Sequence, residues 1–385
     1  MTRAAIVAMA QTRFEPKKGK ERVQEMVWEV VKEVRETTGL GIRQKPGDID
    51  TAVTCSDDFF DARTISDSCI GDLVGAHFGP EEKVAMDGLN ALFYSAACVL
   101  SGHSEVVLLA GHCKESQADS RNLIGYCASD PVFLRGVGLD YLSAAGLQMS
   151  AYLHRTGATE KQCASAVARD RRHAAKNPKA LARKPVSVED VMGSDYVCDP
   201  LKQLDIYPVT DGAIAMIVTT EDRAKKITDK PVYIQGAGSC YNDYYLGDRD
   251  LSRDQALVAA ARRCYQRAGI KDPRHELDLI EIAAAYSYQE LLFLEALGLV
   301  DDGHAGRLIE SGATDLGGKL PVNASGGMLS GNPLLLGGLA RAAECFLQLR
   351  GEAGERQVAG ATRALAQGAT GPAAQHHIVM ALAGK

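Results

Sequence analysis

The sequence predicts an α/β protein made of two similar halves with a long insertion between them. Two observations support this fold class. The order strand, helix, glycine, proline, strand occurs near the N-terminus and again after Pro231, and an order of helix then strand also occurs once in each half. Short apolar strands that alternate with helices are typical of parallel strands joined by right-handed crossovers. A chain of 385 residues is long enough for two or three packed units.

The first half begins with an apolar segment at residues 4–10, which predicts a buried strand. A helix is expected over about 21–37, because its valines recur at helical spacing and form one apolar stripe. Gly39 ends this helix. After a loop marked by Pro46, the segment 49–53 predicts the next strand.

The second half repeats these elements in the same order. A strand at 232–235 precedes a helix at about 252–268, and a further strand is expected at 277–282. Gly269 ends the helix and Pro273 marks the loop, as the corresponding residues do in the first half.

A second pair of elements also matches between the halves. A helix at 90–100 leads into a strand at 105–110, and a helix at 333–349 leads, after a polar loop, toward a strand at 362–366. The same order of elements in both halves indicates a duplicated unit.

The insertion, residues 114–208, has elements of its own. It contains a predicted helix at 142–156 and a capping box formed by Thr159 and Gln162. A basic stretch at 169–184 has two interpretations of equal weight: it holds a phosphorylated ligand, or it is a solvated helix face and loop.

Composition excludes several classes of protein. The chain carries 43 basic and 49 acidic side chains, so it lacks the basic surplus that nucleic-acid binding requires. No apolar run is long enough to span a membrane, and the first ten residues lack the apolar core of a signal peptide. The ten cysteines are scattered without metal-ligand or Cys-x-x-Cys spacing, which indicates reduced thiols, a cytoplasmic location and no metal site.

Three short motifs are interpreted as structural. Gly236-Ala-Gly238 lacks the third glycine of a dinucleotide-binding motif, so we expect a turn there. Gly317-Gly318-Lys319 is not followed by Ser or Thr and does not match a phosphate-binding loop. His376 and His377 are adjacent, so on a strand their side chains point to opposite faces and do not bind one metal ion together.

Four longer stretches carry a family resemblance. They are 177–180 with 186–191 and 199–201, Asp205-Ile-Tyr-Pro-Val-Thr-Asp-Gly-Ala213 with the strand at 214–218, Glu290-Leu-Leu-Phe-Leu-Glu-Ala-Leu-Gly298, and Gly317-Gly-Lys-Leu-Pro-Val-Asn-Ala-Ser-Gly-Gly327. Together they resemble the thiolase superfamily, in particular its sterol-carrier-protein-type branch, over nearly the whole chain.

The resemblance implies the thiolase fold: two βαβαβαββ halves in a five-layered sandwich, with a loop domain that covers coenzyme A. We therefore expect an N-terminal half at 1–113 plus 209–228, the loop domain at 114–208, and a C-terminal half at 229–385. The basic stretch at 169–184 is then expected to belong to the CoA-covering element.

The resemblance also implies a chemistry. Thiolases make or break a carbon–carbon bond next to a CoA thioester, so we expect an acyl-CoA C-acyltransferase of lipid or aromatic acyl-CoA metabolism. Coenzyme A would enter as part of substrate and product, with no tightly bound cofactor. A homodimer formed through the thiolase fold and a small zinc-ribbon and OB-fold partner subunit are implied as well, with no nucleic-acid or membrane partner.

Three reactive positions of the family differ in this sequence. The family uses a cysteine that accepts the acyl group, a His-Asp-x-Phe loop and a Gly-His-Pro loop. Here the cysteine position is Ala85. The histidine of the first loop is Ala283, with Tyr286 as its aromatic residue, and the histidine of the second loop is Asn332. Because alanine cannot accept an acyl group, the standard covalent mechanism is not expected.

One interpretation is an enzyme that works without an acyl-cysteine. Asn332 and backbone N–H groups near Ala85 and Gly371 would bind the oxyanion, and Tyr286 or His376 would move the proton. This arrangement resembles thiolase-derived aldolases, so retro-aldol cleavage of a β-hydroxyacyl-CoA is the close alternative to acyl transfer.

Two alternatives to a non-covalent enzyme stay open. The chain is a non-catalytic scaffold subunit of a thiolase complex, or another thiol, Cys98 or Cys113, replaces the missing nucleophile. Cys98 lies in the middle of a predicted helix, which favours a structural role for it.

Further residues are expected around the substrate pocket. Asp87 orients the substrate or caps the helix that follows, and Asn323, Ser325 and Gly326 match family positions that shape the floor of the site. Tyr286 and Asn332 have structural alternatives, as a packing residue and as a helix N-cap. Small residues at the reactive positions also predict a roomier, more apolar pocket, suited to an aromatic or bulky acyl group.

Overall fold

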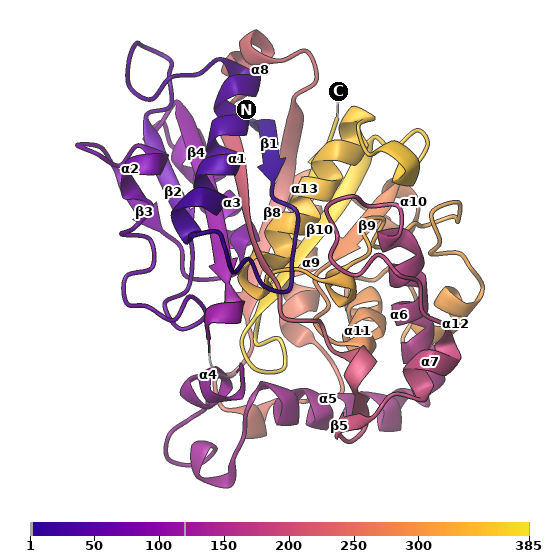
Figure 1. The fold of residues 1–385 in the computed structure, drawn as a ribbon. Coiled ribbons are helices and arrows are strands. Elements are labelled where there is room, and N and C mark those ends of the chain that lie inside the picture. Colours follow the sequence, from indigo (N-terminus) through magenta and orange to yellow (C-terminus); the bar gives the residue numbers. More distant parts are fainter. Residues whose placement is uncertain (1–2, 119–120, 385) are drawn as a thin grey trace.

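The computed structural model describes residues 3–118 and 121–384, and these residues form a mixed α/β fold (Figure 1). Within them, one nine-stranded sheet has the order β3-β2-β4-β7-β1-β8-β11-β10-β9, and β5 pairs with β6. The strands are β1 (Ala4–Gln11), β2 (Thr51–Cys55), β3 (Glu81–Lys83), β4 (Val106–Lys114), β5 (Tyr196–Cys198), β6 (Leu201–Lys202), β7 (Asp211–Thr220), β8 (Val232–Tyr241), β9 (Leu279–Ile282), β10 (Arg363–Thr370) and β11 (His376–Ala383).

The helices alternate with these strands in both halves. They are α1 (Val23–Thr38), α2 (Gly71–Val74), α3 (Gly88–Leu100), α4 (Arg121–Ala128), α5 (Tyr141–Thr156), α6 (Glu160–Ala174), α7 (Val188–Met192), α8 (Glu221–Ile227), α9 (Gln255–Ala268), α10 (Pro273–Glu276), α11 (Ser287–Ala296), α12 (Ala305–Glu310) and α13 (Gly337–Arg350).

The predicted duplication is confirmed. β1, α1, β2, α3, β4 and β7 have counterparts in β8, α9, β9, α13, β10 and β11. The strands joined through helices are parallel, as β2 is to β4 and β9 to β10, whereas β7 and β11 run antiparallel to their neighbours. The edge strand β3 is matched in the second half by an isolated parallel bridge between Ile280 and Val322. The halves join where β1 pairs with β8.

The fold has the five layers expected from the resemblance. They are α1, the strands of the first half, α3 with α13, the strands of the second half, and α9. α1 packs against β1 and β7 of the first half, and its buried valines confirm the apolar stripe. α9 packs against β8 and β11 of the second half. Between them, α3 and α13 contact each other inside one apolar core that also takes side chains from strands of both halves. The fold class is therefore that of the predicted sandwich.

The insertion between β4 and β7 lies at one end of this sandwich, away from the two termini, and contains α4 to α7 (Figure 1). The capping box predicted at Thr159 and Gln162 is present at the start of α6. Arg169 does not face solvent: its guanidinium pairs with Asp170 at 2.6 Å and with Glu290 of α11 at 2.5 Å, all of them buried. Part of the basic stretch therefore anchors the insertion to the second half.

Two predictions about local structure were wrong. The segment Gly236–Gly238 is not a turn but part of β8, where a Cβ on Gly238 would lie 2.1 Å from the carbonyl oxygen of Ala260 in α9. The glycines thus allow close packing of helix on strand. The helix expected from residue 333 begins at Gly337, because residues 334–336 form a 3₁₀ turn. In the described part of the chain, no helix has the length and hydropathy to cross a membrane.

Candidate active site

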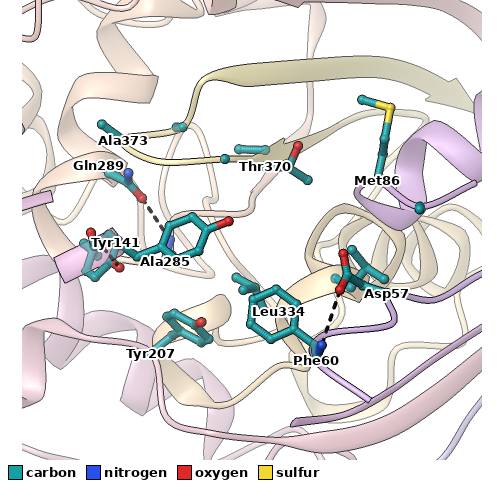
Figure 2. Close-up of a pocket in the computed structure, with 16 residues that line it drawn as sticks. Asp57, Phe60, Met86, Tyr141, Tyr207, Ala285, Gln289, Leu334, Thr370 and Ala373 are labelled. Atoms are coloured by element: carbon teal, nitrogen blue, oxygen red, sulfur yellow. Dashed lines mark hydrogen bonds between the residues drawn. The ribbon is translucent and has the colours of Figure 1, made fainter. Parts of the chain in front are cut away.

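A cavity of about 230 Å³ lies between the two halves and the insertion. Its polar lining residues are Asp57, Tyr141, Tyr207, Tyr286, Gln289 and Thr370. The other lining residues are apolar or glycine and include Phe60, Met86 and Leu334. Figure 2 shows Asp57 and Met86 on one side of the cavity and Tyr141 and Gln289 on the other.

The carboxyl ends of strands from both halves deliver these groups. Asp57 follows β2, Met86 follows β3, Tyr286 follows β9, and Thr370 ends β10. Tyr141 opens α5 of the insertion. Ligand sites of open α/β sheets commonly lie outside the carboxyl ends of strands, so the position fits a substrate site.

The hairpin between β10 and β11 forms one wall and is held in an unfavourable backbone conformation. Ala373 and Ala374 both line the cavity with positive φ, 47° and 51°. Arg249 fixes this turn by donating to the carbonyls of Pro372 (2.8 Å) and Ala373 (2.6 Å). Such conformations in non-glycine residues cluster at functional sites.

The phenols form a cluster around the cavity. The ring of Tyr286 lies edge-on to Tyr207 and is stacked with Tyr288, each with centroids 6.3 Å apart. Burial raises the pKa of Tyr141 to about 12 and raises the pKa values of Tyr207 and Tyr286 above the ordinary range. These hydroxyls therefore stay protonated at neutral pH and can donate hydrogen bonds.

Asp57 brings a carboxylate to the same cavity. Its Oδ1 accepts hydrogen bonds from the N–H groups of Phe59 (2.8 Å) and Phe60 (3.3 Å), the second of which is drawn in Figure 2. Burial, supported by the negative charges of Asp61 and Asp58, raises the pKa of Asp57. The two N–H donors oppose that shift. A carboxylate in this setting is suited to proton transfer.

Three of the residues predicted from sequence line the cavity: Ala85, Tyr286 and Gly371. Asp87 lies behind them and is fully buried. Its Oδ1 accepts from the N–H of Leu89 at the start of α3, and its Oδ2 accepts from the N–H of Gly338 at the start of α13, both at 2.8 Å. Burial raises the pKa of Asp87 to about 7. Of its two expected roles, the structure shows the helix cap.

The remaining floor residues are also buried and do not line the cavity. Asn323 accepts a hydrogen bond from the N–H of Ile282 (2.8 Å). Ser325 donates to the carboxylate of Glu281 (2.7 Å), and Gly326 has a φ of 97° at a place where a Cβ would lie 2.5 Å from the Cβ of Ala174. Ala283 donates its N–H to the side chain of Gln367 (2.9 Å). These residues hold the loop that leads from β9 to Tyr286.

Asn332 and His376 are separated from the cavity as well. The Oδ1 of Asn332 accepts from Arg341 (3.3 Å), and its amide donates to the carbonyl of Pro333 (2.7 Å). Because the helix begins at Gly337, the expected N-cap role of Asn332 was wrong. His376 bonds through Nε2 to the hydroxyl of Ser239 (2.8 Å), and burial lowers its pKa to about 4.

His377 points to the opposite face of β11, as predicted for adjacent strand residues. Its Nε2 lies 2.7 Å from Asp254, and its Nδ1 lies 3.1 Å from the amide nitrogen of Gln367. Gln367 in turn holds Ala283. The two histidines therefore share no ligand position, and within the described chain no cluster of three His, Cys, Asp or Glu side chains is arranged for a metal ion.

No cysteine of the described residues lines the cavity. Burial raises the pKa values of Cys55, Cys98 and Cys113, so these thiols are poor nucleophiles. Neither of the two replacement thiols considered from the sequence reaches the site.

Sequence reasoning missed Asp57, Tyr141, Tyr207, Gln289 and Thr370. Asp57 carried a usable signal, since it follows the predicted strand at 49–53 and the carboxyl ends of such strands gather at one site. Tyr207 lies inside the stretch 205–213 that carried the family resemblance. Tyr141 and Gln289 show no such signal, because a single aromatic or amide residue at a helix start is common.

Comparisons with known proteins agree with this architecture. Residues 237–382 match the thiolase C-terminal domain-like family. The acetyl-CoA acetyltransferase of Methanothermobacter thermautotrophicus is 36% identical over 321 residues, which cover 80% of this chain and 83% of that protein. Sterol carrier protein 2 of Oryctolagus cuniculus is 38% identical over 205 residues, 51% of this chain and 37% of that protein.

A third relative is named a lyase. The 17-hydroxy-3-oxo-4-pregnene-20-carboxyl-CoA lyase of Mycobacterium tuberculosis is 34% identical over 231 residues, 57% of each chain. Among solved structures, an Ltp2-ChsH2(DUF35) aldolase superposes with a TM-score of 0.80 at 24% identity, over 98% of this chain and 97% of that one. The superposition shows a shared fold.

Proposed function

The chain belongs to the thiolase superfamily, in its sterol-carrier-protein-type branch, and we propose that it cleaves a β-hydroxyacyl-CoA between its α- and β-carbons by a retro-aldol reaction. The observation that carries this proposal is the composition of the cavity. It contains three phenols and one carboxylate, and no thiol from the described residues. Such a site can move protons and stabilise an oxyanion, but it offers no acceptor for an acyl group.

The reaction needs no covalent intermediate. The proton leaves the β-hydroxyl, the Cα–Cβ bond breaks, and the β-carbon becomes a carbonyl. The electron pair passes to the thioester as an enolate, whose α-carbon then takes up a proton. Tyr286 and Tyr141 are protonated phenols at the cavity and would donate hydrogen bonds to the enolate oxygen, where charge develops.

The relatives support two reactions. The mycobacterial relative is named a CoA-thioester lyase, which fits the proposal. Acyl transfer is the second candidate, because the archaeal relative that matches most of the chain is named an acetyltransferase. Without a cavity thiol, acyl transfer would have to proceed by direct attack of free CoA on the substrate.

We propose that residues 114–208 cover coenzyme A, which enters as part of the substrate without a tightly bound cofactor. A small partner subunit is proposed too, on the support of the Ltp2-ChsH2(DUF35) complex with the same fold. If only that partner subunit carries activity, this chain is a scaffold subunit.

Product analysis by mass spectrometry tests the proposal. The protein, alone and with any co-purifying subunit, is incubated with 3-hydroxybutanoyl-CoA, 3-hydroxy-3-phenylpropanoyl-CoA and a tertiary 3-hydroxyacyl-CoA, and separately with 3-oxoacyl-CoA plus free CoA. A carbonyl product and a shortened thioester formed without free CoA support retro-aldol cleavage. Thiolysis of the 3-oxo substrate alone would establish acyl transfer instead, and no turnover of either would favour a scaffold.

A further inference from the structure

We propose that Asp57 is the base of this cavity: it accepts the proton of the β-hydroxyl group and returns a proton to the α-carbon. This assignment rests on the proposed retro-aldol reaction and names the group that drives it. No family motif points to Asp57, and the evidence for this role is geometric.

The first argument is elimination among the lining side chains. A base at neutral pH requires a carboxylate, an imidazole, a thiolate or a neutral amine. In the described part of the chain, Asp57 is the one such group that lines the cavity. The phenols are too weakly acidic to provide a base at neutral pH, and Gln289 and Thr370 do not titrate.

His376, the histidine considered from the sequence, does not compete for this role. It lies on β11, bonded to Ser239 and in contact with the ring of Tyr241, whose centroid is 4.3 Å from its own. It is buried and is absent from the cavity wall.

The second argument concerns the two oxygens of Asp57. Both hydrogen bonds to this carboxylate end on Oδ1. Oδ2 makes no hydrogen bond to the described residues, and none of their cations pairs with it. Lys83 pairs with Asp58 (2.5 Å) and Asp67 (3.1 Å). One oxygen of Asp57 thus fixes the side chain to its turn, and the other remains free to take a proton.

The proton balance closes with this single group. The carboxylate removes the hydroxyl proton as the Cα–Cβ bond breaks and the carbonyl forms. The resulting carboxylic acid then gives a proton to the enolate carbon, which regenerates the carboxylate and releases the shortened acyl-CoA. No oxidant, reductant or further reactant is required.

Two rates test the assignment: cleavage of a 3-hydroxyacyl-CoA, and exchange of the α-protons of acetyl-CoA in D₂O followed by NMR. The Asp57→Asn variant keeps an oxygen for the N–H groups of Phe59 and Phe60 but cannot accept a proton. We expect both rates to fall by about 10²–10⁴-fold. The affinity for acetyl-CoA and the Tm should stay close to the wild-type values.

Asp58→Asn is the matched control, because it makes the same change one residue away on a carboxylate that does not line the cavity. It should retain both rates. An Asp57→Asn variant with rates within threefold of wild type would overturn the assignment. Loss of both rates together with acetyl-CoA affinity, or loss of only one rate, would overturn it as well.

The exchange rate separates this assignment from the proposed function. A wild-type protein that exchanges α-protons but cleaves no hydroxyacyl-CoA would refute the retro-aldol reaction, while loss of exchange in Asp57→Asn would still identify the base. A wild-type protein that does neither would refute both.

Discussion

Tyr286 connects the family motif to the proposed chemistry. Its ring packs between Tyr207 and Tyr288, and its hydroxyl makes one long hydrogen bond, 3.4 Å to the carbonyl of Tyr141. We expect Tyr286→Phe to lower kcat for cleavage by about 10²-fold or more, because a donor to the enolate oxygen is lost, with little change in Tm. Steady-state kinetics and thermal unfolding measure the two effects.

Tyr288→Phe is the matched control for this variant. The hydroxyl of Tyr288 donates to Gln148 (2.8 Å) and the residue does not line the cavity, so kcat should be unchanged. Its Tm should fall, because the buried Oε1 of Gln148 loses this hydrogen bond and keeps only the long one from Gln289 (3.4 Å). The role of Tyr286 would be disproved by a Tyr286→Phe enzyme as fast as wild type.

The same residues show how far a motif can locate a site. Ala85, Tyr286 and Gly371 could be predicted because they lie at or near the reactive positions of the family, and all three line the cavity. For Asn332 and His376 the motif could not predict that the side chains lie away from the cavity, because the direction of a side chain depends on partners distant in sequence. Arg341 turns Asn332 toward α13, and Ser239 holds His376 on the sheet.

His376 gives the protein a testable dependence of stability on pH. Burial, with a smaller effect of His377, lowers its pKa from 6.5 to about 4 in the folded state. Since the unfolded chain binds this proton more tightly, the stabilisation is present above pH 6.5 and is lost as the pH falls toward 4. The loss is on the order of 3 kcal/mol.

His376→Gln tests this directly, because Gln can still bond to Ser239 but does not titrate. Urea unfolding of both proteins at pH 7 and at pH 4.5 should show a larger loss of unfolding free energy in wild type than in the variant. Equal losses in the two proteins would show that His376 makes no such contribution.

At the level of elements, the contact between β8 and α9 is set by two glycines. A Cβ on Gly238 would lie 2.1 Å from the carbonyl oxygen of Ala260, so the helix backbone has no room to accommodate it. We expect Gly238→Ala to lower the unfolding free energy by about 1–3 kcal/mol or more. The midpoint of urea denaturation measures the change.

Gly317→Ala is the matched control for packing. A Cβ on Gly317 would meet no atom within 4 Å. The free energy of unfolding of this variant should stay within about 0.5 kcal/mol of wild type. Equal midpoints for the two alanine variants would contradict the close approach of α9 to β8.

Element prediction succeeded where one local signal controlled the outcome. The valine stripe of α1 and its glycine end at Gly39 needed no partner to be recognised. It failed where tertiary packing determines the local structure. The glycines at Gly236–Gly238 were predicted to form a turn, but they belong to β8 and allow α9 to pack closely on it. The 3₁₀ turn at 334–336, which places Leu334 and Leu335 in the cavity wall, was likewise not predicted.

At the scale of the whole molecule, duplication explains both what was predictable and what was not. The repeated order of elements was sufficient to predict two halves, and the family resemblance predicted their layers. The cavity, however, draws side chains from β10, from the insertion and from the loops after β2 and β9, which are far apart in sequence. Only the folded chain brings Asp57 of one half and Tyr286 of the other to one site.

This arrangement predicts that the whole protein carries no acyl group during turnover. The cysteines of the described chain lie outside the cavity, and the position that faces it is Ala85. Intact-mass analysis after incubation with excess acetyl-CoA should therefore show the unmodified chain. An Ala85→Cys variant is the positive control for access, because iodoacetamide should alkylate its new thiol and acetyl-CoA should protect it. A stable acetyl adduct on any wild-type cysteine would refute the non-covalent mechanism, since a covalent step would then split the reaction in two.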